Sequence, residues 1–458
     1  MQIKESFRKY LEEAIGCERA LIAFSAFDEP AKVSVRYNPF KKGCASEGNP
    51  VPWNRHGRLL AERPKFTLDP HFHGGAYYVQ DSSSMFVGHV FRNLLEKFRS
   101  SSEGVVRVLD LCAAPGGKTT DLAASLREVY GDRFVLVSNE VMKQRAGILA
   151  DNVALWGDPN VVVTSDDPRA FASLSGFFDV VVADVPCSGE GMFRKDEEAQ
   201  RQWSEDNVSL CQARQKRIIA DMWPCLKPGG MLVYSTCTFN RYENDDNVQW
   251  IADELGADVL VPVEEDVLGV IRTVHGYSLV PGHVEGEGQY CAALVKTVDD
   301  FNGSYGSSRG GKERPGKKPA AVIPSTLKAL FTVPVELRQK SDTVIAVPSV
   351  IAADVSLIEK SLHVLSAGCA VGVLKGQTLV PDADLALSVA YAADSYPVAD
   401  VDLQTALAFL HKDAIVLPDS EKGYVLIRYE GVPLGFVKNL GNRCNNLHPQ
   451  GRRIRMDI

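Results

Sequence analysis

The chain has 458 residues, of which 45% are hydrophobic and 24% are charged, a composition typical of globular proteins with two to four domains. No apolar run approaches a membrane span and the N-terminus lacks the apolar centre of a signal peptide, so we expect a cytoplasmic protein. The net charge of −8 argues against a protein that coats nucleic acid indiscriminately, although a local basic patch is compatible with it.

The ten cysteines are scattered without Cys-x-x-Cys pairs. Several lie in apolar runs where a disulfide partner is improbable, which indicates reduced thiols. A zinc site among Cys187, Cys211, Cys225 and Cys237 is conceivable, but structural zinc favours closely spaced ligand pairs that this sequence lacks. We therefore expect no metal site.

The N-terminal region combines one amphipathic helix with a long irregular stretch. Apolar residues at helical spacing predict a helix over Ser6–Leu21, and Val33–Tyr37 reads as a strand. The stretch that follows, to about Ser84, is rich in Gly, Pro, Asn and His and predicts a loop-rich connection, in which His71 and His73 are loop residues.

The central region alternates strands with helices. Helices are predicted at about Lys118–Tyr130 and Asn207–Leu226, the second ended by Pro228-Gly229-Gly230. Alternation of this kind predicts a doubly wound, Rossmann-like, mostly parallel sheet with ligands at the carboxyl ends of its strands. The predicted strands, with the last one closing the sheet as its edge, are Val105–Leu111, Phe134–Asn139, Val161–Thr164, Phe178–Val185, Met231–Thr236 and Tyr290–Lys296.

The C-terminal third begins after a linker of low hydrophobicity, Asp299–Pro319. Short apolar pieces predict small mixed modules with strands at Val344–Val347, Val371–Leu374, Tyr424–Tyr429 and Pro433–Lys438. The tail from Leu434 to Met456 has no acidic residue and predicts a basic patch made by Lys438, Arg443, Arg452, Arg453 and Arg455.

A glycine-rich turn follows the first central strand: Asp110-Leu111-Cys112-Ala113-Ala114-Pro115-Gly116-Gly117-Lys118. A strand before it and a helix after it are the context of a cofactor-binding turn, although the pattern is not the dinucleotide Gly-x-Gly-x-x-Gly. Acidic residues after later strands favour a sugar-bearing, positively charged sulfonium cofactor. Glu140 is placed to bind ribose hydroxyls, and Asp167 lies where an adenine ring would be.

Two cysteines end hydrophobic runs downstream: Cys187 in Asp184-Val185-Pro186-Cys187, and Cys237 in Tyr234-Ser235-Thr236-Cys237. A thiol at such positions favours methylation of carbon, because C5 of a pyrimidine is a poor nucleophile until a thiolate adds at C6. Amine methyltransferases commonly carry an aromatic residue where Cys187 stands.

Polar residues near these cysteines have simpler interpretations. The run Arg194–Glu197 is typical of a solvated helix start. Glu243 and Asn244 precede a helix and are interpreted as its caps.

These motifs, in this order, resemble those of the Sun/Fmu-type RNA (cytosine-5) methyltransferases, most closely the RsmF-like branch that modifies small-subunit ribosomal RNA. The resemblance rests on Cys112–Lys118, Asp184–Phe193 and Tyr234–Phe239 and covers roughly the first 300 residues. It is weaker in Leu434–Lys438 and Asn445–Arg453, a region that in RsmF-like proteins belongs to a PUA-like RNA-binding module.

The resemblance implies a role for each site residue. Cys237 would be the nucleophile at C6, and Cys187 would help to release the product. Asp184 would bind the cytosine edge near N3 and supply a proton, assisted by Lys118. S-adenosylmethionine would be held by Cys112, Ala113, Ala114, Pro115, Gly116, Gly117, Lys118, Glu140, Asp167 and Asp184.

The resemblance also implies a domain plan and a substrate. We expect an N-terminal RNA-binding or entry domain of mixed α+β structure, a methyltransferase domain, a linker, a middle domain and a PUA-like RNA-binding domain, at residues 1–84, 85–298, 299–319, 320–398 and 399–458. The expected substrate is 16S ribosomal RNA of the small subunit, modified by a monomer. Transfer RNA as the substrate, or a catalytically silent ribosome assembly factor, are the alternatives.

Overall fold

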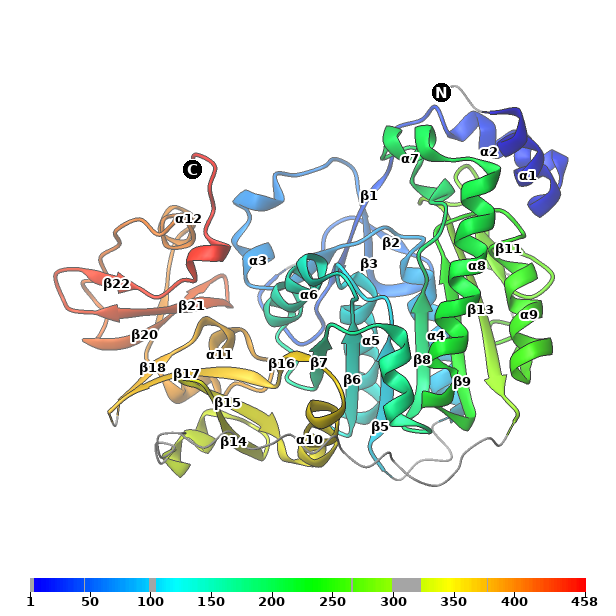
Figure 1. Cartoon of the computed structure of the whole chain (residues 1–458). Helices are drawn as coiled ribbons and strands as arrows, with labels where there is room; N and C mark the ends of the chain where they lie inside the picture. The colour runs from blue at the N-terminus through cyan, green and yellow to red at the C-terminus, as the bar shows by residue number, and fades with distance from the viewer. Residues whose placement is uncertain (1–3, 45, 99–103, 265–266, 299–322, 377) are drawn as a thin grey trace.

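The computed structural model describes residues 4–44, 46–98, 104–264, 267–298, 323–376 and 378–458. The strands in this part of the chain form one sheet of ten strands and three sheets of four. Figure 1 shows the large sheet between the C-terminal sheets on the left and the first two helices at the upper right. None of the described helices combines the length and apolarity needed to cross a lipid bilayer.

The N-terminal amphipathic segment forms two helices, α1 (Glu5–Ile15) and α2 (Cys17–Ala26), where the periodicity predicts one. The break is at Gly16, whose φ of 86° lies in the left-handed region that glycine adopts without steric cost. The predicted apolar stripe is buried nonetheless, at Phe7, Leu11 and Ile15.

The stretch predicted to be loop-rich contributes most of a small antiparallel sheet of order β2-β3-β1-β4. The predicted strand at Val33–Tyr37 is confirmed as β1, which pairs with β3 and β4. Polar residues interrupt the apolar alternation of β3, which hides it from a pattern search. His71 and His73 lie in the short helix α3 and not in a loop. The other elements are β2 (Asn49–Val51), β3 (Asn54–Leu60), η1 (Phe66–Leu68), α3 (Pro70–His73) and β4 (Tyr77–Val79).

The central sheet has the order β11-β12-β13-β9-β8-β5-β6-β7-β16, and β10 also pairs with β13. Strands β7, β6, β5, β8 and β9 are parallel, as the alternation of elements predicts. Their bounds lie close to the predictions: β5 (Val106–Asp110), β6 (Phe134–Asn139), β7 (Val161–Thr164), β8 (Phe178–Asp184) and β9 (Leu226–Thr236).

The edges of this sheet differ from the prediction. Strand β13 (Gln289–Lys296), expected at the edge, pairs with β9 on one side and with β12 (Tyr277–Leu279) and β10 (Ala257–Leu260) on the other. Beyond β12 lies β11 (Ile271–Arg272). These added strands have two to four residues and are too short to give a periodic signal.

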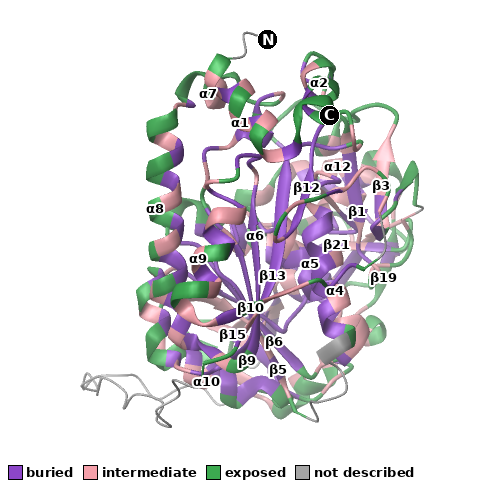
Figure 2. Cartoon of the chain, turned by 90° about the vertical axis from the view of Figure 1, so that its right-hand side faces the viewer, coloured by how far each residue is buried: buried purple, intermediate pink, exposed green. Residues whose placement is uncertain are grey.

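Helices cover both faces of the central sheet. On one face pack α4 (Met85–Phe98), α5 (Gly117–Tyr130) and α6 (Lys143–Trp156). The other face is covered by α8 (Glu205–Met222), α9 (Asp245–Leu255) and α10 (Ala352–Ser361). Successive strand residues point to opposite faces, and both sets are apolar, so the central strands β5, β6, β7 and β8 are almost wholly buried (Figure 2).

Helix α8 ends earlier than the Pro-Gly-Gly signal predicts. It stops at Met222, and the turn η4 (Trp223–Cys225) follows. Pro224 lacks the backbone N–H that a helix needs, which ends the helix there. The predicted stop, Pro228-Gly229-Gly230, lies inside β9.

The C-terminal third contributes two sheets of four strands, of order β14-β15-β17-β18 and β19-β20-β21-β22. It also contributes β16 (Val364–Ala367), which pairs with β7 and so extends the central sheet. The predicted linker, 299–319, lies outside the described residues. The remaining strands are β14 (Val335–Lys340), β15 (Thr343–Pro348), β17 (Cys369–Lys375), β18 (Thr378–Pro381), β19 (Val398–Asp400), β20 (Gly423–Tyr429), β21 (Val432–Asn439) and β22 (Cys444–Asn446). The remaining helices are α7 (Glu197–Gln202), α11 (Ala383–Leu387) and α12 (Leu403–His411).

Candidate active site

The glycine-rich turn forms a fixed loop between β5 and α5. Gly116 has a φ of 113° and precedes the first residue of α5, a conformation that favours glycine. Side chains from α6 hold the loop from outside: Arg145 Nη2 donates to Ala114 O at 2.8 Å, and Asn152 Nδ2 donates to Pro115 O at 2.8 Å. Side chains of α6 therefore hold the loop in one conformation.

The two acidic residues predicted to bind a cofactor lie after β6 and β7. Glu140 is buried; its Oε1 accepts from Met142 N at 2.9 Å, and its Oε2 lies 3.2 Å from Arg145 Nη1. Asp167 accepts from Arg169 N at 3.1 Å and caps the 3-10 helix η2 (Pro168–Leu174). Both carboxylates thus sit at the carboxyl edge of the sheet, where ligands of such folds bind.

A buried acidic oxygen without a hydrogen-bond partner lies beneath the loop. Asp110 Oδ2 accepts from Thr119 Oγ1 at 2.6 Å, whereas Asp110 Oδ1 receives no hydrogen bond from the described residues. Burial raises the pKa of Asp110 to about 7. Carboxylates at the ends of neighbouring strands, beside a glycine-rich turn, suit a ligand that has sugar hydroxyls and a cationic centre. The loop, Glu140, Asp167 and Asp184 therefore fit S-adenosylmethionine.

Asp184 and Lys118 form an ion pair across the site. Lys118 Nζ donates to Asp184 Oδ2 at 2.8 Å and to Ser84 Oγ at 3.0 Å. Burial works against the charge on both groups, but the pair outweighs it: the pKa of Lys118 is raised and that of Asp184 is lowered. Asp184 Oδ1 accepts from Ser235 Oγ at 2.7 Å and from Gln289 Nε2 at 3.2 Å. At neutral pH Asp184 is a carboxylate beside an ammonium group.

The two cysteines meet next to this pair. β8 and β9 are parallel neighbours, with Asp184 opposite Ser235, so the segments that follow them emerge side by side. Cys187 Sγ lies 3.2 Å from Cys237 Sγ, and both residues are half-buried free thiols. The hydrogen bond to Cys237, followed by burial, raises the pKa of Cys187 well above that of an ordinary thiol. Cys187 is therefore a protonated thiol at neutral pH.

A buried hydrogen-bond network that sequence reasoning missed joins the two cysteine-bearing loops. Glu243, predicted to be a cap, is fully buried and accepts from Ser188 N at 3.0 Å and Gln215 Nε2 at 2.7 Å. Burial raises the pKa of Glu243 to about 7. Asn244 occupies the N-cap position of α9. Its side chain does not cap the helix, because its Oδ1 accepts a hydrogen bond from Thr236 Oγ1.

Glu190 is the second carboxylate of this network. It is fully buried and accepts from Phe239 N at 2.7 Å, Asn240 N at 3.0 Å and Trp203 Nε1 at 2.8 Å. Glu190 lies in the loop that follows Cys187, and it accepts from backbone N–H groups in the loop that follows Cys237. It therefore links the two loops. An acidic residue between two glycines gives no local sign of such a role.

The run Arg194–Glu197 is only partly a solvated helix start. Arg194 is nearly buried and forms a bidentate pair with Glu287, with nitrogen–oxygen distances of 2.9 and 3.0 Å. Lys195 Nζ donates to Asp81 Oδ2 at 2.9 Å. Asp196 caps α7, as a helix start requires.

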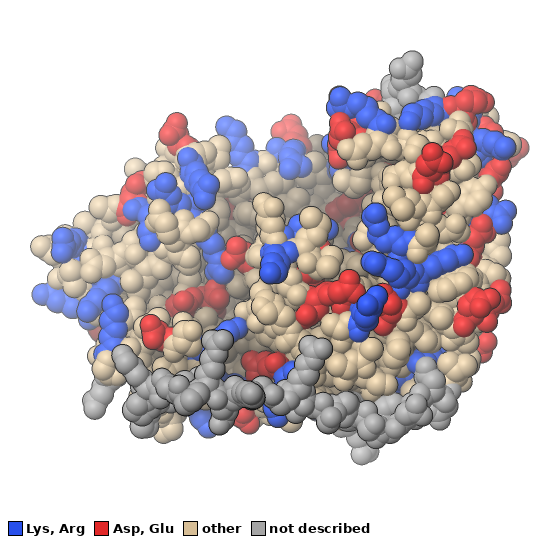
Figure 3. All heavy atoms as spheres, viewed as in Figure 1, with Lys and Arg blue, Asp and Glu red and all other residues tan. Residues whose placement is uncertain are grey.

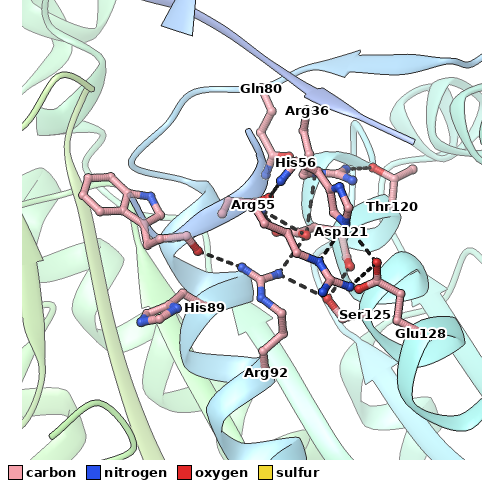
Figure 4. Close-up of polar contacts among 12 residues, drawn as sticks. Arg36, Arg55, His56, Gln80, His89, Arg92, Thr120, Asp121, Ser125 and Glu128 are labelled. Carbon is pink, nitrogen blue, oxygen red and sulfur yellow. Dashed lines mark hydrogen bonds and ion pairs between the residues drawn. The ribbon is translucent and has the colours of Figure 1, made fainter. Parts of the chain in front are cut away.

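Arg36 on β1 supports the cofactor loop from the N-terminal sheet. Its side chain is 1% exposed, and its Nη2 donates to Gly117 O at 3.2 Å and to Thr120 Oγ1 at 2.5 Å. Figure 4 shows Arg36 and Arg92 converging on Asp121 of α5, with nitrogen–oxygen distances of 3.8 and 3.1 Å. No motif marks Arg36 in the sequence.

Comparison with known proteins identifies three consecutive domains. Residues 3–82 match the N-terminal domain of 16S rRNA methyltransferase RsmF, residues 101–295 match 16S rRNA methyltransferase RsmB/F, and residues 396–454 match the methyltransferase RsmF PUA domain. The relatives include ribosomal RNA small subunit methyltransferase F of Enterobacter sp. (strain 638), 27% identical over 97% of this chain and 95% of its own. The protein of the same description from Aliivibrio fischeri is 28% identical over 98% and 97%.

Solved structures of methyltransferases have a similar fold. A methyltransferase homologue from Pyrococcus horikoshii superposes with a TM-score of 0.51 at 25% identity, over 64% of this chain and 100% of its own. NSun6 from Pyrococcus horikoshii, solved with SFG, shares the fold at a TM-score of 0.51 and 17% identity, over 65% and 99%. The chain belongs to the RsmB/F family of S-adenosylmethionine-dependent RNA methyltransferases.

Proposed function

We propose that this protein methylates C5 of a cytosine in 16S ribosomal RNA of the small subunit, through a covalent bond between Cys237 and C6. The observation that carries the proposal is the pair of free thiols, Cys187 and Cys237, 3.2 Å apart beside the ion pair of Lys118 and Asp184. The names and full-length similarity of the relatives support the ribosomal substrate.

The ion pair can activate the base. Cytosine C6 becomes electrophilic when N3 gains a proton or a strong hydrogen bond. Asp184 is ionised in the free chain, so we propose that the Lys118 ammonium first gives a proton to Asp184 across their 2.8 Å contact, and that Asp184 then passes this proton to N3. This retains the predicted contact of Asp184 with N3 and makes Lys118 the proton source.

The two thiols have different roles in forming and breaking the covalent bond to C6. Cys237 adds to C6 as a thiolate, and the raised pKa of Cys187, which keeps that thiol protonated, supports this assignment. S-adenosylmethionine, bound by the loop 112–118 with Glu140, Asp167 and Asp184, supplies the methyl group. After water takes the C5 proton, the C6–S bond breaks, and the Cys187 thiol donates a hydrogen bond to the departing Cys237 thiolate.

The domain plan remains part of this proposal. Residues 1–84 and 399–458 would contact RNA on either side of the methyltransferase domain at 85–298, with the linker at 299–319 and the middle domain at 320–398. We further propose that the protein acts as a monomer in the cytoplasm. The support for a monomer is that one chain supplies both thiols, the ion pair and the cofactor loop.

Methyl transfer from labelled S-adenosylmethionine tests the substrate. Small ribosomal subunits, naked 16S ribosomal RNA and bulk transfer RNA are offered in parallel, and the nucleosides of each are separated. We expect label as 5-methylcytidine in subunits or ribosomal RNA and none in transfer RNA. Label in transfer RNA alone would mean that the reaction is as proposed but that the substrate is transfer RNA and not 16S ribosomal RNA.

A further inference from the structure

A cavity of about 470 Å³ lies between the N-terminal sheet and α6, away from the catalytic thiols. Its volume is within the range of about 300–1,000 Å³ common for ligand pockets. The segment 63–67 and strand β4 form one wall, α6 forms the opposite wall, and Met456 of the C-terminal tail contributes to the rim.

The walls carry aromatic rings. Phe66 and Phe72 are half-buried, and their ring centroids lie 6.4 Å apart; each packs near Tyr77, at 6.1 and 5.9 Å. Tyr78 and Trp156 add two more rings to the lining. Half-exposed rings of this kind provide flat apolar surface that a planar ligand can cover.

The charge on the walls has one sign. Among the described lining residues, the charged ones are Arg63 and Lys65, both exposed, and none is acidic. The guanidinium of Arg63 lies 5.6 Å from the centroid of Phe66, so charge and ring adjoin. This combination suits a ligand that is both planar and anionic.

The C-terminal tail brings further positive charge to the rim. Arg452 is held in place by Asp384 at 2.7 Å and by Asp151 of α6 at 3.5 Å. Its neighbours Arg453 and Arg455 are exposed, and Met456 lines the cavity. Part of the basic patch predicted from the sequence therefore flanks this cavity.

Two lining residues also touch the cofactor loop. Tyr78 Oη donates to Pro115 O at 3.2 Å, and Asn152 Nδ2 donates to the same oxygen at 2.8 Å. The cavity thus adjoins the outer side of the loop whose inner side faces the cofactor.

We propose that this cavity binds an unpaired nucleotide of the RNA substrate that neighbours the target cytosine. Its base stacks on the rings of Phe66, Phe72 and Tyr78, while Arg63, Lys65 and the tail arginines contact the adjoining phosphates. This inference rests on the proposed function and adds a second nucleotide site to it. Aromatic rings stack on any base, so this site contributes to the affinity for RNA more than to the sequence specificity.

Fluorescence anisotropy with two probes tests the proposal: a labelled eight-nucleotide oligocytidylate and a ribose-phosphate oligomer of equal length without bases. We expect Phe66→Leu, which keeps an apolar side chain but removes the ring, to weaken oligocytidylate binding about fivefold or more and to leave the abasic oligomer within twofold. Lys65→Ala should weaken both probes and reduce the salt slope by about 0.7. Lys360→Ala, on the exposed side of α10, is the matched control and should change neither.

Kinetics separate this inference from the proposed function. If wild-type protein makes 5-methylcytidine and Phe66→Leu raises the KM for RNA without changing the S-adenosylmethionine Kd, both stand. If wild type methylates RNA but Phe66→Leu binds oligocytidylate as wild type does, the cavity proposal fails alone, and a protein or other occupant replaces it. Arg63→Gln and Lys65→Ala alter only exposed side chains and keep the test valid if Phe66→Leu unfolds.

Discussion

At the scale of single residues, the two cysteines of the site, Cys187 and Cys237, differ in their surroundings. The Sγ atoms of Cys187 and Cys237 lie 3.2 Å apart, and this contact, together with burial, raises the pKa of Cys187. Buried Glu190 and Glu243 fix the two loops that carry the thiols. The two cysteine motifs predict the chemistry, and the different surroundings of the two thiols support the roles proposed for them.

Substitution of each cysteine should give opposite results. We expect Cys187→Ala to accumulate a covalent RNA adduct, because the departing thiolate loses a hydrogen bond worth about 1.5–3 kcal/mol and its release slows by roughly tenfold or more. Cys237→Ala should form no adduct. Labelled RNA on a denaturing protein gel reports the slow band, and Cys17→Ala, an exposed cysteine outside the site, should turn over normally. An adduct with Cys237→Ala alone would reverse the two roles.

At the scale of elements, the site depends on a contact between two sheets. Arg36 extends from β1 of the N-terminal sheet and bonds Gly117 and Thr120, at the start of the helix that follows the cofactor loop. Its guanidinium also lies 4.6 Å from the ring centroid of Trp156 on α6. The N-terminal sheet therefore stabilises the cofactor loop in addition to any contact it makes with RNA.

Arg36→Met should destabilise the protein and weaken cofactor binding together. Breaking a buried ion pair costs about 3–5 kcal/mol, because Asp121 and Gln80 lose a partner inside the protein. Urea unfolding measures the first effect and calorimetric titration with S-adenosylmethionine the second. The control is Arg55→Met, which removes the exposed partner of Glu128 shown in Figure 4 and should cost at most about 1 kcal/mol. Unchanged cofactor affinity in Arg36→Met would show that the arginine stabilises the fold alone.

The sequence predicts elements well where the pattern is local. Strands β6 and β7 are predicted to the residue, because buried parallel strands are continuous apolar runs. Strand β3 is missed because polar residues interrupt its apolar alternation, and β16 is missed because its partner, β7, is about 200 residues away in sequence. The same holds in the site: Cys237 lies in a recognisable motif, whereas Arg36 lies outside every motif and acts through contacts with residues more than 80 positions away.

At the scale of the whole molecule, this acidic protein carries exposed positive charge on its C-terminal part. Figure 3 shows Lys and Arg spread over the left-hand lobe, which the C-terminal sheets form. The predicted basic tail does not act as one unit, however. Arg452 is occupied by Asp151 and Asp384, which leaves Arg453 and Arg455 exposed beside the cavity.

Replacement of both exposed arginines, Arg453→Gln with Arg455→Gln, should weaken RNA binding and its dependence on salt. Each lost phosphate contact on single-stranded RNA reduces the slope of log K against log salt by about 0.7, so we expect a change of about 1.4. Filter binding of 16S ribosomal RNA at several salt concentrations measures it. Lys375→Gln, exposed at the end of β17, serves as control. An unchanged slope would mean that the tail arginines do not contact phosphate.

The pairing of β16 with β7 determines how the protein can be shortened. A fragment cut at residue 320 would keep the family's catalytic motifs but lose β16, and the backbone N–H and C=O groups of β7 would become an open edge (Figure 1). Exposed edges recruit strands from other molecules, which promotes aggregation. A catalytic fragment suited to expression and crystallisation should therefore continue beyond Ala367, and insolubility of a shorter one would say nothing about its chemistry.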